Sequence, residues 1–197
     1  LMIRRPPRST QGVSSASSDV YKRQTVYRGR LLHVTCAEVS LPNGRTSKRD
    51  LVRHPGGVVV VAVTDDGRVY LERQFRTALG CVITELPAGK REPGEDPDLT
   101  ARRELKEETG LVAQRWEKLG ELVTTPGFSD ETLHIYLATG LAQQETERDE
   151  DEFIELFTLP LEEAYQQAMR GALPDAKTIA GLAMAHARWT AEHTKGE

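Results

Sequence analysis

The chain has 197 residues, of which 38% are hydrophobic and 28% are charged, and its formal net charge is −4. This length suffices for one ordinary domain with a sizeable core and is too short for two full ones. No apolar run approaches the roughly 20 residues that a membrane helix needs, and no apolar segment near the start resembles a secretion signal. We therefore expect one domain in the cytoplasm, with no membrane partner.

Residues 1–24 differ from the rest of the chain because they are rich in Ser, Pro and Arg and lack apolar periodicity. They also resemble a peptide translated from sequencing-adaptor DNA, so we expect a disordered, non-native tail. A basic nucleic-acid-binding arm is the alternative. The tail holds five of the 26 basic residues and one of the 30 acidic ones, which leaves 21 against 29, or about −8, in the remainder. This acidic remainder argues against a nucleic-acid partner.

The next segment, residues 25–53, contains two strand-like runs that flank Pro42-Asn43-Gly44-Arg45. An Asn-Gly pair supplies the positive φ angles of a tight hairpin turn. We therefore expect an N-terminal β-hairpin over residues 25–53, followed by the main domain over residues 54–197.

Alternating strands and helices are expected in that domain. The continuous apolar run from Val58 to Val63 is typical of a buried central strand. Further strands are expected over residues 68–73, 81–86, 116–123, 132–138 and 153–159. Helical spacing near the end of the chain predicts helices over residues 161–170 and 175–191.

A further helix is predicted from about Pro97 to Thr109. Asp96 offers an N-cap oxygen, and Pro97 suits the first helical position because its missing N–H would have no partner there. Gly110 can adopt the left-handed conformation that ends a helix. The apolar residues that can face a core are Leu99, Ala101 and Leu105.

Three carboxylates, Glu104, Glu107 and Glu108, are expected to share one exposed face of this helix. Their repulsion costs only about 0.2–0.5 kcal/mol per pair, so a solvated acidic face is one interpretation. A metal site is the other. Mg²⁺ and Mn²⁺ prefer carboxylate oxygens and keep positions open for water and substrate phosphates.

The stretch around these carboxylates has a defined pattern. It runs as Gly89, five residues, Glu95, seven residues, and then Arg103-Glu104-Leu105-Lys106-Glu107-Glu108-Thr109-Gly110-Leu111. This pattern resembles the box of the Nudix hydrolase family, and every fixed position of the box is filled. The resemblance implies an α/β fold, the Nudix α/β/α sandwich with a mixed sheet. It also implies a metal-dependent hydrolase that cleaves a nucleoside diphosphate linked to a further group.

The same resemblance implies roles for individual residues. The implied metal ligands, for Mg²⁺ or possibly Mn²⁺, are Glu104, Glu108, Glu107 and the carbonyl of Ala88. Glu95 and Arg103 are implied to support these ligands through hydrogen bonds. The base that activates water is expected in the acidic segment 145–152, as Glu150 or Glu152, with Glu107 of the box as a further catalytic candidate. A solvated charge run is the alternative reading of that segment.

Within the family, Pro126 lies 15 residues beyond Leu111, a spacing associated with ADP-ribose pyrophosphatases. The segments Glu85–Gly89 and Pro126–Glu131 match the same branch. The implied substrate-binding residues are Arg53, Arg76 and Glu85 for the nucleotide, and Pro126, Phe128, Ser129 and Glu131 for the ribose side. A solvated charge at a strand end is the alternative for Arg76.

The sequence thus leads to the hypothesis of a homodimeric enzyme that uses Mg²⁺ to hydrolyse ADP-ribose to AMP and ribose 5-phosphate. GDP-mannose or another nucleoside diphosphate-sugar is the nearest alternative substrate. A non-catalytic Nudix module that senses a nucleotide is a third possibility, which the complete box disfavours.

Overall fold

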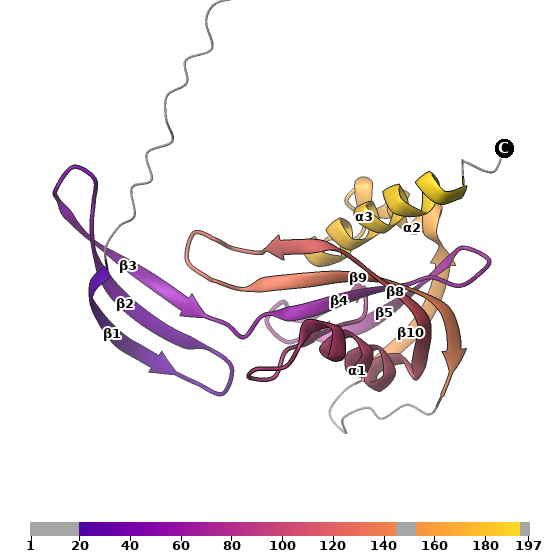
Figure 1. Cartoon of the computed structure of the whole chain (residues 1–197), viewed down its shortest axis with the longest axis horizontal. Helices are drawn as coiled ribbons and strands as arrows, with labels where there is room; N and C mark the ends of the chain where they lie inside the picture. The colour runs from indigo at the N-terminus through magenta and orange to yellow at the C-terminus, as the bar shows by residue number, and fades with distance from the viewer. Residues whose placement is uncertain (1–19, 145–152, 194–197) are drawn as a thin grey trace, which may run out of the picture. The chain divides into compact units, whose positions relative to one another are not determined.

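The computed structural model describes residues 20–144 and 153–193, and the chain divides after Val52 into two compact units (Figure 1). The first unit is a three-stranded sheet in the order β1-β2-β3. Its strands are β1 (Val20–Arg28), β2 (His33–Ser40) and β3 (Thr46–Arg53). Between β2 and β3, Gly44 has a φ of 76° and donates its N–H to the carbonyl oxygen of Leu41 at 2.9 Å. The turn predicted at Asn43-Gly44 is therefore confirmed.

The boundary of the expected tail is wrong for residues 20–24, because β1 begins at Val20. These residues pair antiparallel with β2, and Gln24 lies opposite Cys36. The polar run Lys22-Arg23-Gln24 gives no apolar alternation in the sequence. Strand formation here depends on the cross-strand neighbours that β2 supplies, which local composition does not report. The expected hairpin is accordingly one part of a three-stranded sheet.

The second unit contains two sheets. The first is mixed and has the order β7-β4-β9-β8, in which β4 (Gly57–Ala62) runs parallel to β9 (Thr132–Gln143) and antiparallel to β7 (Ala88–Lys90). Its edge strand β8 (Leu111–Val123) is antiparallel to β9. The second sheet has the order β10-β5-β6, and its strands are β10 (Ile154–Pro160), β5 (Arg68–Arg76) and β6 (Cys81–Glu85).

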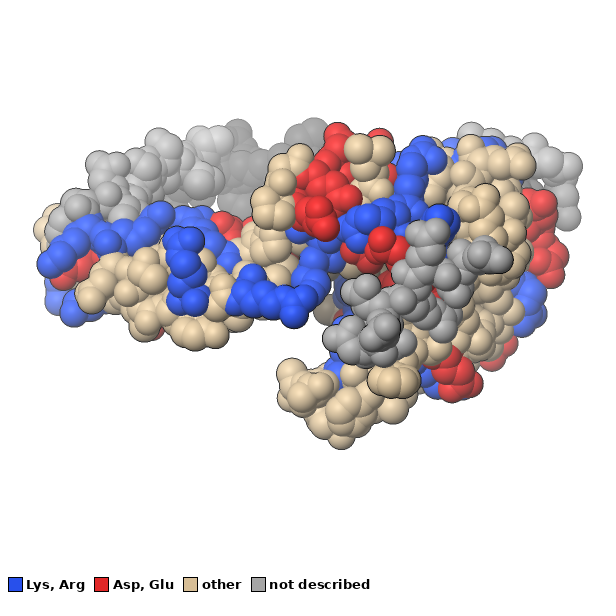
Figure 2. Space-filling model, turned by 90° about the horizontal axis from the view of Figure 1, so that it is seen from below, with Lys and Arg blue, Asp and Glu red and all other residues tan. Residues whose placement is uncertain are grey.

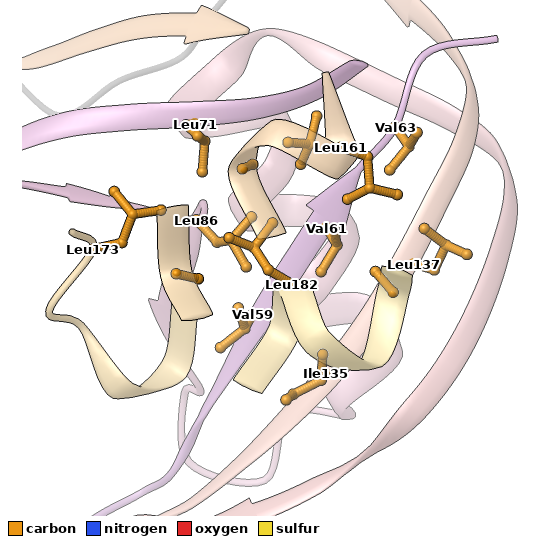
Figure 3. Close-up of a cluster of buried hydrophobic side chains, with 14 of the residues drawn as sticks. Val59, Val61, Val63, Leu71, Leu86, Ile135, Leu137, Leu161, Leu173 and Leu182 are labelled. Carbon is orange, nitrogen blue, oxygen red and sulfur yellow. The ribbon is translucent and has the colours of Figure 1, made fainter. Parts of the chain in front are cut away.

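Strand β4 separates two hydrophobic cores, and all six of its residues are buried. Val59 and Val61 pack toward α2 (Leu161–Met169) and α3 (Ala176–His193), as Figure 3 shows for this cluster. Val58 and Val60 belong to the other core, which α1 (Pro97–Thr109) covers. Successive side chains of a strand point to opposite faces, so a run of Val can serve both cores. Helices therefore lie on both sides of the sheet (Figure 1), and the expected α/β/α sandwich is confirmed.

Helix α1 begins and ends as predicted. The Asp98 N–H donates to Asp96 Oδ1 at 2.8 Å, and Gly110 has a φ of 69° and donates its N–H to the Lys106 carbonyl oxygen at 2.8 Å. The expectation that Leu99 faces a core is wrong, because this side chain is 61% exposed. The residues of α1 that pack in the core beneath this helix are Ala101 and Leu105. Leu99 lies in the first turn, where spacing alone cannot tell how far the sheet extends beneath the helix.

Helix α3 approaches the end of β6 closely. A Cβ on Gly181 would lie 2.6 Å from Leu86 Cδ1, so a larger residue at that position would have to displace the buried Leu86 side chain. The backbone N–H of Leu86 also donates to the hydroxyl of Thr178 at 2.9 Å. This packing fixes the start of α3 beside the segment that leads into β7. In the described part of the chain, no helix has the length and apolarity to span a membrane.

Candidate functional site

Strand β7 brings the start of the box against β4. Its three residues pair antiparallel with β4, and Gly89 lies opposite Val58. A Cβ on Gly89 would lie 1.8 Å from Glu104 Cδ, which means that the Glu104 carboxyl group fills the space a side chain would need. Glycine is therefore required at position 89 for Glu104 to hold this position. A three-residue strand was not expected from the sequence, because it is too short to show a period.

Arg103 joins three carboxylates of the box. Its Nε and Nη2 each lie 3.0 Å from one oxygen of Glu95, while its Nη1 donates to Glu104 Oε1 and Glu107 Oε2, both at 2.8 Å. The fork of a guanidinium suits such paired contacts. Within this cluster, three negative charges share one positive charge. Figure 2, drawn from the side on which Figure 1 places α1, shows acidic and basic side chains in contact on that surface.

These contacts stabilise the charged forms of both partners. The hydrogen bond from Arg103 is the main reason that the pKa of Glu95 falls to about 2, and the backbone N–H of Glu92 adds to the effect while burial opposes it. The same pair raises the pKa of Arg103 above its usual value. Glu95 and Arg103 therefore both stay ionised across the physiological range, and they hold Glu104 and Glu107 from one side.

Glu108 does not share the exposed face that was expected for the three carboxylates. It is only 4% exposed, and its Oε2 accepts the backbone N–H of Ala88 at 3.0 Å. The side chains of Glu104 and Glu107 are 13% and 33% exposed. Helical spacing fixes the direction in which each side chain points around α1. The exposure of each side chain depends instead on how α1 packs against β7. The box thus brings Ala88 and the three glutamates of α1 together.

The chemistry of these groups fits a hard divalent cation, since carboxylate and carbonyl oxygens are the ligands that Mg²⁺ and Mn²⁺ prefer. Within residues 20–144 and 153–193, no three His, Cys, Asp or Glu side chains are already arranged to hold a metal ion. Glu104 and Glu107 instead share the Nη1 atom of Arg103. A bound cation would therefore compete with Arg103 for their oxygens.

A second charged cluster forms around Glu85, at the end of β6. The side chain of Glu85 is 3% exposed, and its Oε2 lies 2.5 Å from Arg76 Nε. Its Oε1 accepts a hydrogen bond from Lys177 Nζ, and Lys177 Nζ also lies 2.9 Å from Asp175 Oδ2. Burial lowers the pKa of Arg76, but the hydrogen bond and charge of Glu85 outweigh it, so the pKa is raised. Arg76 and Glu85 are thus brought together as a pair.

Lys177 and Asp175 were missed by reasoning from the sequence. Asp175 could have been found as an N-cap, because its Oδ2 accepts the N–H of Thr178 at 2.9 Å. The contact of Lys177 with Glu85 joins residues 92 positions apart, and no local pattern reports it.

The loop between β8 and β9 contains the remaining candidates. Asp130 was not predicted as a site residue. Its Oδ2 lies 2.5 Å from Arg53 Nη1, and its Oδ1 accepts the His54 N–H at 3.0 Å. Glu131 donates its N–H to Ser129 Oγ at 3.2 Å and accepts from the Thr124 hydroxyl at 2.7 Å. Pro126 and Phe128 are exposed. Glu150 and Glu152 lie outside the described residues.

Comparisons with known proteins show the family of the chain. The family model of the NUDIX domain matches residues 53–182. The chain is 42% identical to the ADP-ribose pyrophosphatase of Bacillus subtilis (strain 168), over 84% of this chain and 91% of that protein. It is 45% identical to the methanol dehydrogenase activator of Bacillus methanolicus, over 80% of this chain and 86% of that protein.

Among solved structures, the chain is similar to one described as the crystal structure of ADP compounds hydrolase, with a TM-score of 0.79 and 23% identity over 89% of this chain and 95% of that one. This likeness supports the fold. The chain therefore belongs to the Nudix family. It is a Nudix hydrolase, and members of this family generally use a divalent metal ion.

Proposed function

We propose that this enzyme hydrolyses the diphosphate bond of ADP-ribose, giving AMP and ribose 5-phosphate, with Mg²⁺ as its metal. Two relatives named ADP-ribose pyrophosphatase support this substrate, at 42% identity in Bacillus subtilis and 38% in Mycobacterium tuberculosis (strain ATCC 25618 / H37Rv), over 84% and 83% of this chain. The GDP-mannose pyrophosphatase of Cronobacter sakazakii (strain ATCC BAA-894) is less similar, at 32%. The observation that carries the proposal is the cluster of box carboxylates around Arg103.

The residues proposed to hold the metal are Glu104, Glu107, Glu108 and the carbonyl of Ala88. A bound divalent cation supplies positive charge to the diphosphate and makes a nearby water more acidic. Arg103 and Glu95 orient Glu104 and Glu107 by the hydrogen bonds described above. Glu108 holds the backbone of Ala88 through the N–H of that residue. The start of β7, which carries the Ala88 carbonyl, is thereby tied to α1.

For the substrate, we propose that Arg76, positioned by Glu85, contacts the diphosphate. Arg53 and the loop residues Pro126, Phe128, Ser129 and Glu131 are proposed to contact the nucleoside and ribose. The ring of Phe128 is 53% exposed and offers an apolar face for stacking. Arg53 is already paired with Asp130, so its contact with substrate would be made from that fixed position.

The base is proposed to be Glu150 or Glu152, which lie outside the described residues. Changing the base to Gln should lower kcat by about 10²–10⁴-fold with little change in KM, because a general base acts in the transition state. The Gln variant of the other residue is the matched control and should be nearly silent. If both variants keep the parental kcat, the base is elsewhere, and Glu107 or Glu108 of the box becomes the leading candidate.

A substrate panel tests the proposed function. ADP-ribose, GDP-mannose, NADH and oxidised nucleoside triphosphates are incubated with Mg²⁺, and products are identified by chromatography. We expect kcat/KM to be highest for ADP-ribose, by about tenfold or more, and we expect a chelator to remove the activity. A preference for GDP-mannose would favour the alternative substrate. Binding of nucleotides without turnover would favour a sensing module.

A homodimer and a cytoplasmic location stay predictions. In the N-terminal sheet, Val26 and Tyr27 are 66% and 59% exposed. A small sheet that presents large apolar side chains is suited to contact with a second copy. Sedimentation analysis of the chain tests the dimer, and a monomer at micromolar concentration would contradict it.

A further inference from the structure

Arg76 is held in place through one of its three nitrogens. Its Nε atom donates to Glu85 Oε2 at 2.5 Å, and within the described residues its two terminal nitrogens make no hydrogen bond. The side chain is 37% exposed, so these nitrogens can meet a ligand from solution. A guanidinium whose terminal nitrogens are available can bind two oxygens of one anion at once.

Lys177 explains why Arg76 binds Glu85 through Nε alone. A carboxylate and a guanidinium facing each other tend to form two parallel hydrogen bonds, which would engage a terminal nitrogen as well. Lys177 Nζ binds Oε1 of Glu85, so a hydrogen bond from a terminal nitrogen of Arg76 would have to share that oxygen with a second cation. Both side chains are largely buried, with exposed fractions of 3% for Glu85 and 15% for Lys177. Water therefore has limited access to replace either partner.

Lys177 is itself held in place by Asp175. Its Nζ lies 2.9 Å from Asp175 Oδ2, and the same oxygen accepts the hydroxyl of Thr178 at 2.6 Å. That hydroxyl in turn accepts the N–H of Leu86, the residue after Glu85. The start of α3 and the end of β6 are thus joined by one hydrogen-bond network. Lys177 is held at a set distance from Glu85 by both the helix and the strand.

We propose that Lys177 is a positioning residue for substrate binding: by holding one oxygen of Glu85, it keeps the terminal nitrogens of Arg76 available for a diphosphate. The proposal rests on the proposed function in one respect, namely that the anion is the diphosphate of a nucleoside diphosphate-sugar. Lys177 itself does not contact the substrate. Its effect passes through Glu85 to Arg76.

The test begins with Lys177→Met, which keeps an unbranched side chain, one atom shorter than that of lysine, and removes its charge. Without Lys177, Arg76 would turn to bind both oxygens of Glu85, so we expect KM for ADP-ribose to rise by about tenfold, which is the loss of one charge-assisted hydrogen bond. We expect kcat to change by less than about threefold, because the lost contact serves the ground state and the transition state alike. Lys177→Arg should restore most of the parental KM. Lys118→Met, an exposed lysine on β8, is the matched control and should leave KM unchanged.

A second variant separates positioning from a merely structural role. In Lys177→Met/Glu85→Gln, the amide oxygen can still accept from Arg76 Nε, but the amide nitrogen cannot accept from a terminal nitrogen of Arg76. KM should therefore fall back toward the parental value although the network has lost two partners. A structural role predicts the opposite, an additive or greater loss. An unchanged KM in Lys177→Met, or no recovery in the double variant, overturns the proposal. If Lys177→Met does not fold, Lys177→Gln carries the same test.

Binding of ADP, measured by titration calorimetry with Mg²⁺, separates this proposal from the proposed function. If the parent turns over none of the nucleoside diphosphate-sugars, the proposed function fails, and the Kd for ADP then decides the role of Lys177. We expect Lys177→Met to weaken ADP binding by about tenfold. Equal Kd values for the parent and Lys177→Met would overturn the positioning role independently of any activity.

Discussion

The two charged clusters of this protein differ in the residue at their centre. Around Arg103, three carboxylates share one guanidinium. Around Glu85, two cations contact one carboxylate, and Lys177 also contacts Asp175. A second buried carboxylate, Glu72, lies opposite Glu85 on β5. The first cluster keeps an excess of negative charge and suits a cation, while the second leaves the terminal nitrogens of Arg76 for an anion. Which group is left with available atoms, rather than the residue types alone, decides which ligand each cluster can accept.

The two clusters are also close in the chain. Glu85 ends β6, and Ala88 begins β7 after Leu86 and Pro87. The charge of Glu108 contributes to the raised pKa of Arg76, so the clusters influence each other electrostatically. A diphosphate with its metal needs both kinds of site side by side. The following changes test how far the contrast between the clusters explains the activity.

The largest effect is expected for Glu108→Gln, which removes a charge from the first cluster. The amide oxygen of Gln can still accept the Ala88 N–H, so the fold should remain intact. We expect kcat/KM at ordinary Mg²⁺ to fall by at least about 100-fold, since changes even to groups behind a metal ligand cost about 10–100-fold. Activity assays over a range of Mg²⁺ concentrations measure this.

The matched control for that change is Glu117→Gln on β8, which removes an exposed ion pair with Arg188 and should cost little. Parental turnover by Glu108→Gln would mean that this helix does not supply the metal ligands.

A smaller effect is expected for Gly89→Ala. The added Cβ would lie 1.8 Å from Glu104 Cδ and must displace the carboxylate from Arg103. We expect the Mg²⁺ concentration for half-maximal activity to rise by about 10–100-fold, with the melting temperature close to that of the parent. Gly120→Ala is the control, because its Cβ would meet only Met184 at 3.6 Å, an ordinary contact. If both variants respond to Mg²⁺ as the parent does, the position of the Glu104 carboxylate does not depend on the absence of a side chain at residue 89.

The smallest effect concerns pH and the Arg103–Glu95 pair. The pKa of Glu95 is lowered to about 2 in the folded protein, compared with about 4.3 in an unfolded chain. The pair therefore stabilises the fold fully above about pH 4.3, and this contribution is lost as the pH falls through 2. Urea unfolding of the parent and of Glu95→Gln should show a difference in free energy of unfolding at pH 7 that shrinks below pH 4.3. A difference that is independent of pH would show that the charge of Glu95 is not what stabilises the fold.

Much of the fold was predictable because its signals are local. The apolar run at Val58–Val63, the caps at Asp96 and Gly110 and the Asn43-Gly44 turn each depend on neighbours in the chain, and the structure confirms all three. Other features were not predictable because their signals are not local. Strand β1 and the three-residue strand β7 exist only because a partner strand lies beside them. Their sequences alone do not distinguish them from loops.

For the candidate site, the sequence by itself determined the box, the helix that carries it and therefore the family, since spacing along one helix fixes which side chains point the same way. Tertiary structure decided how deep each carboxylate lies, so that Glu108 is buried against Ala88 while Glu107 stays partly exposed. It also decided the partners of Glu85, because Lys177 arrives from a helix 92 positions further along the chain. Burial and long-range charge pairing depend on which elements pack together, and the local pattern of residues carries no record of that packing.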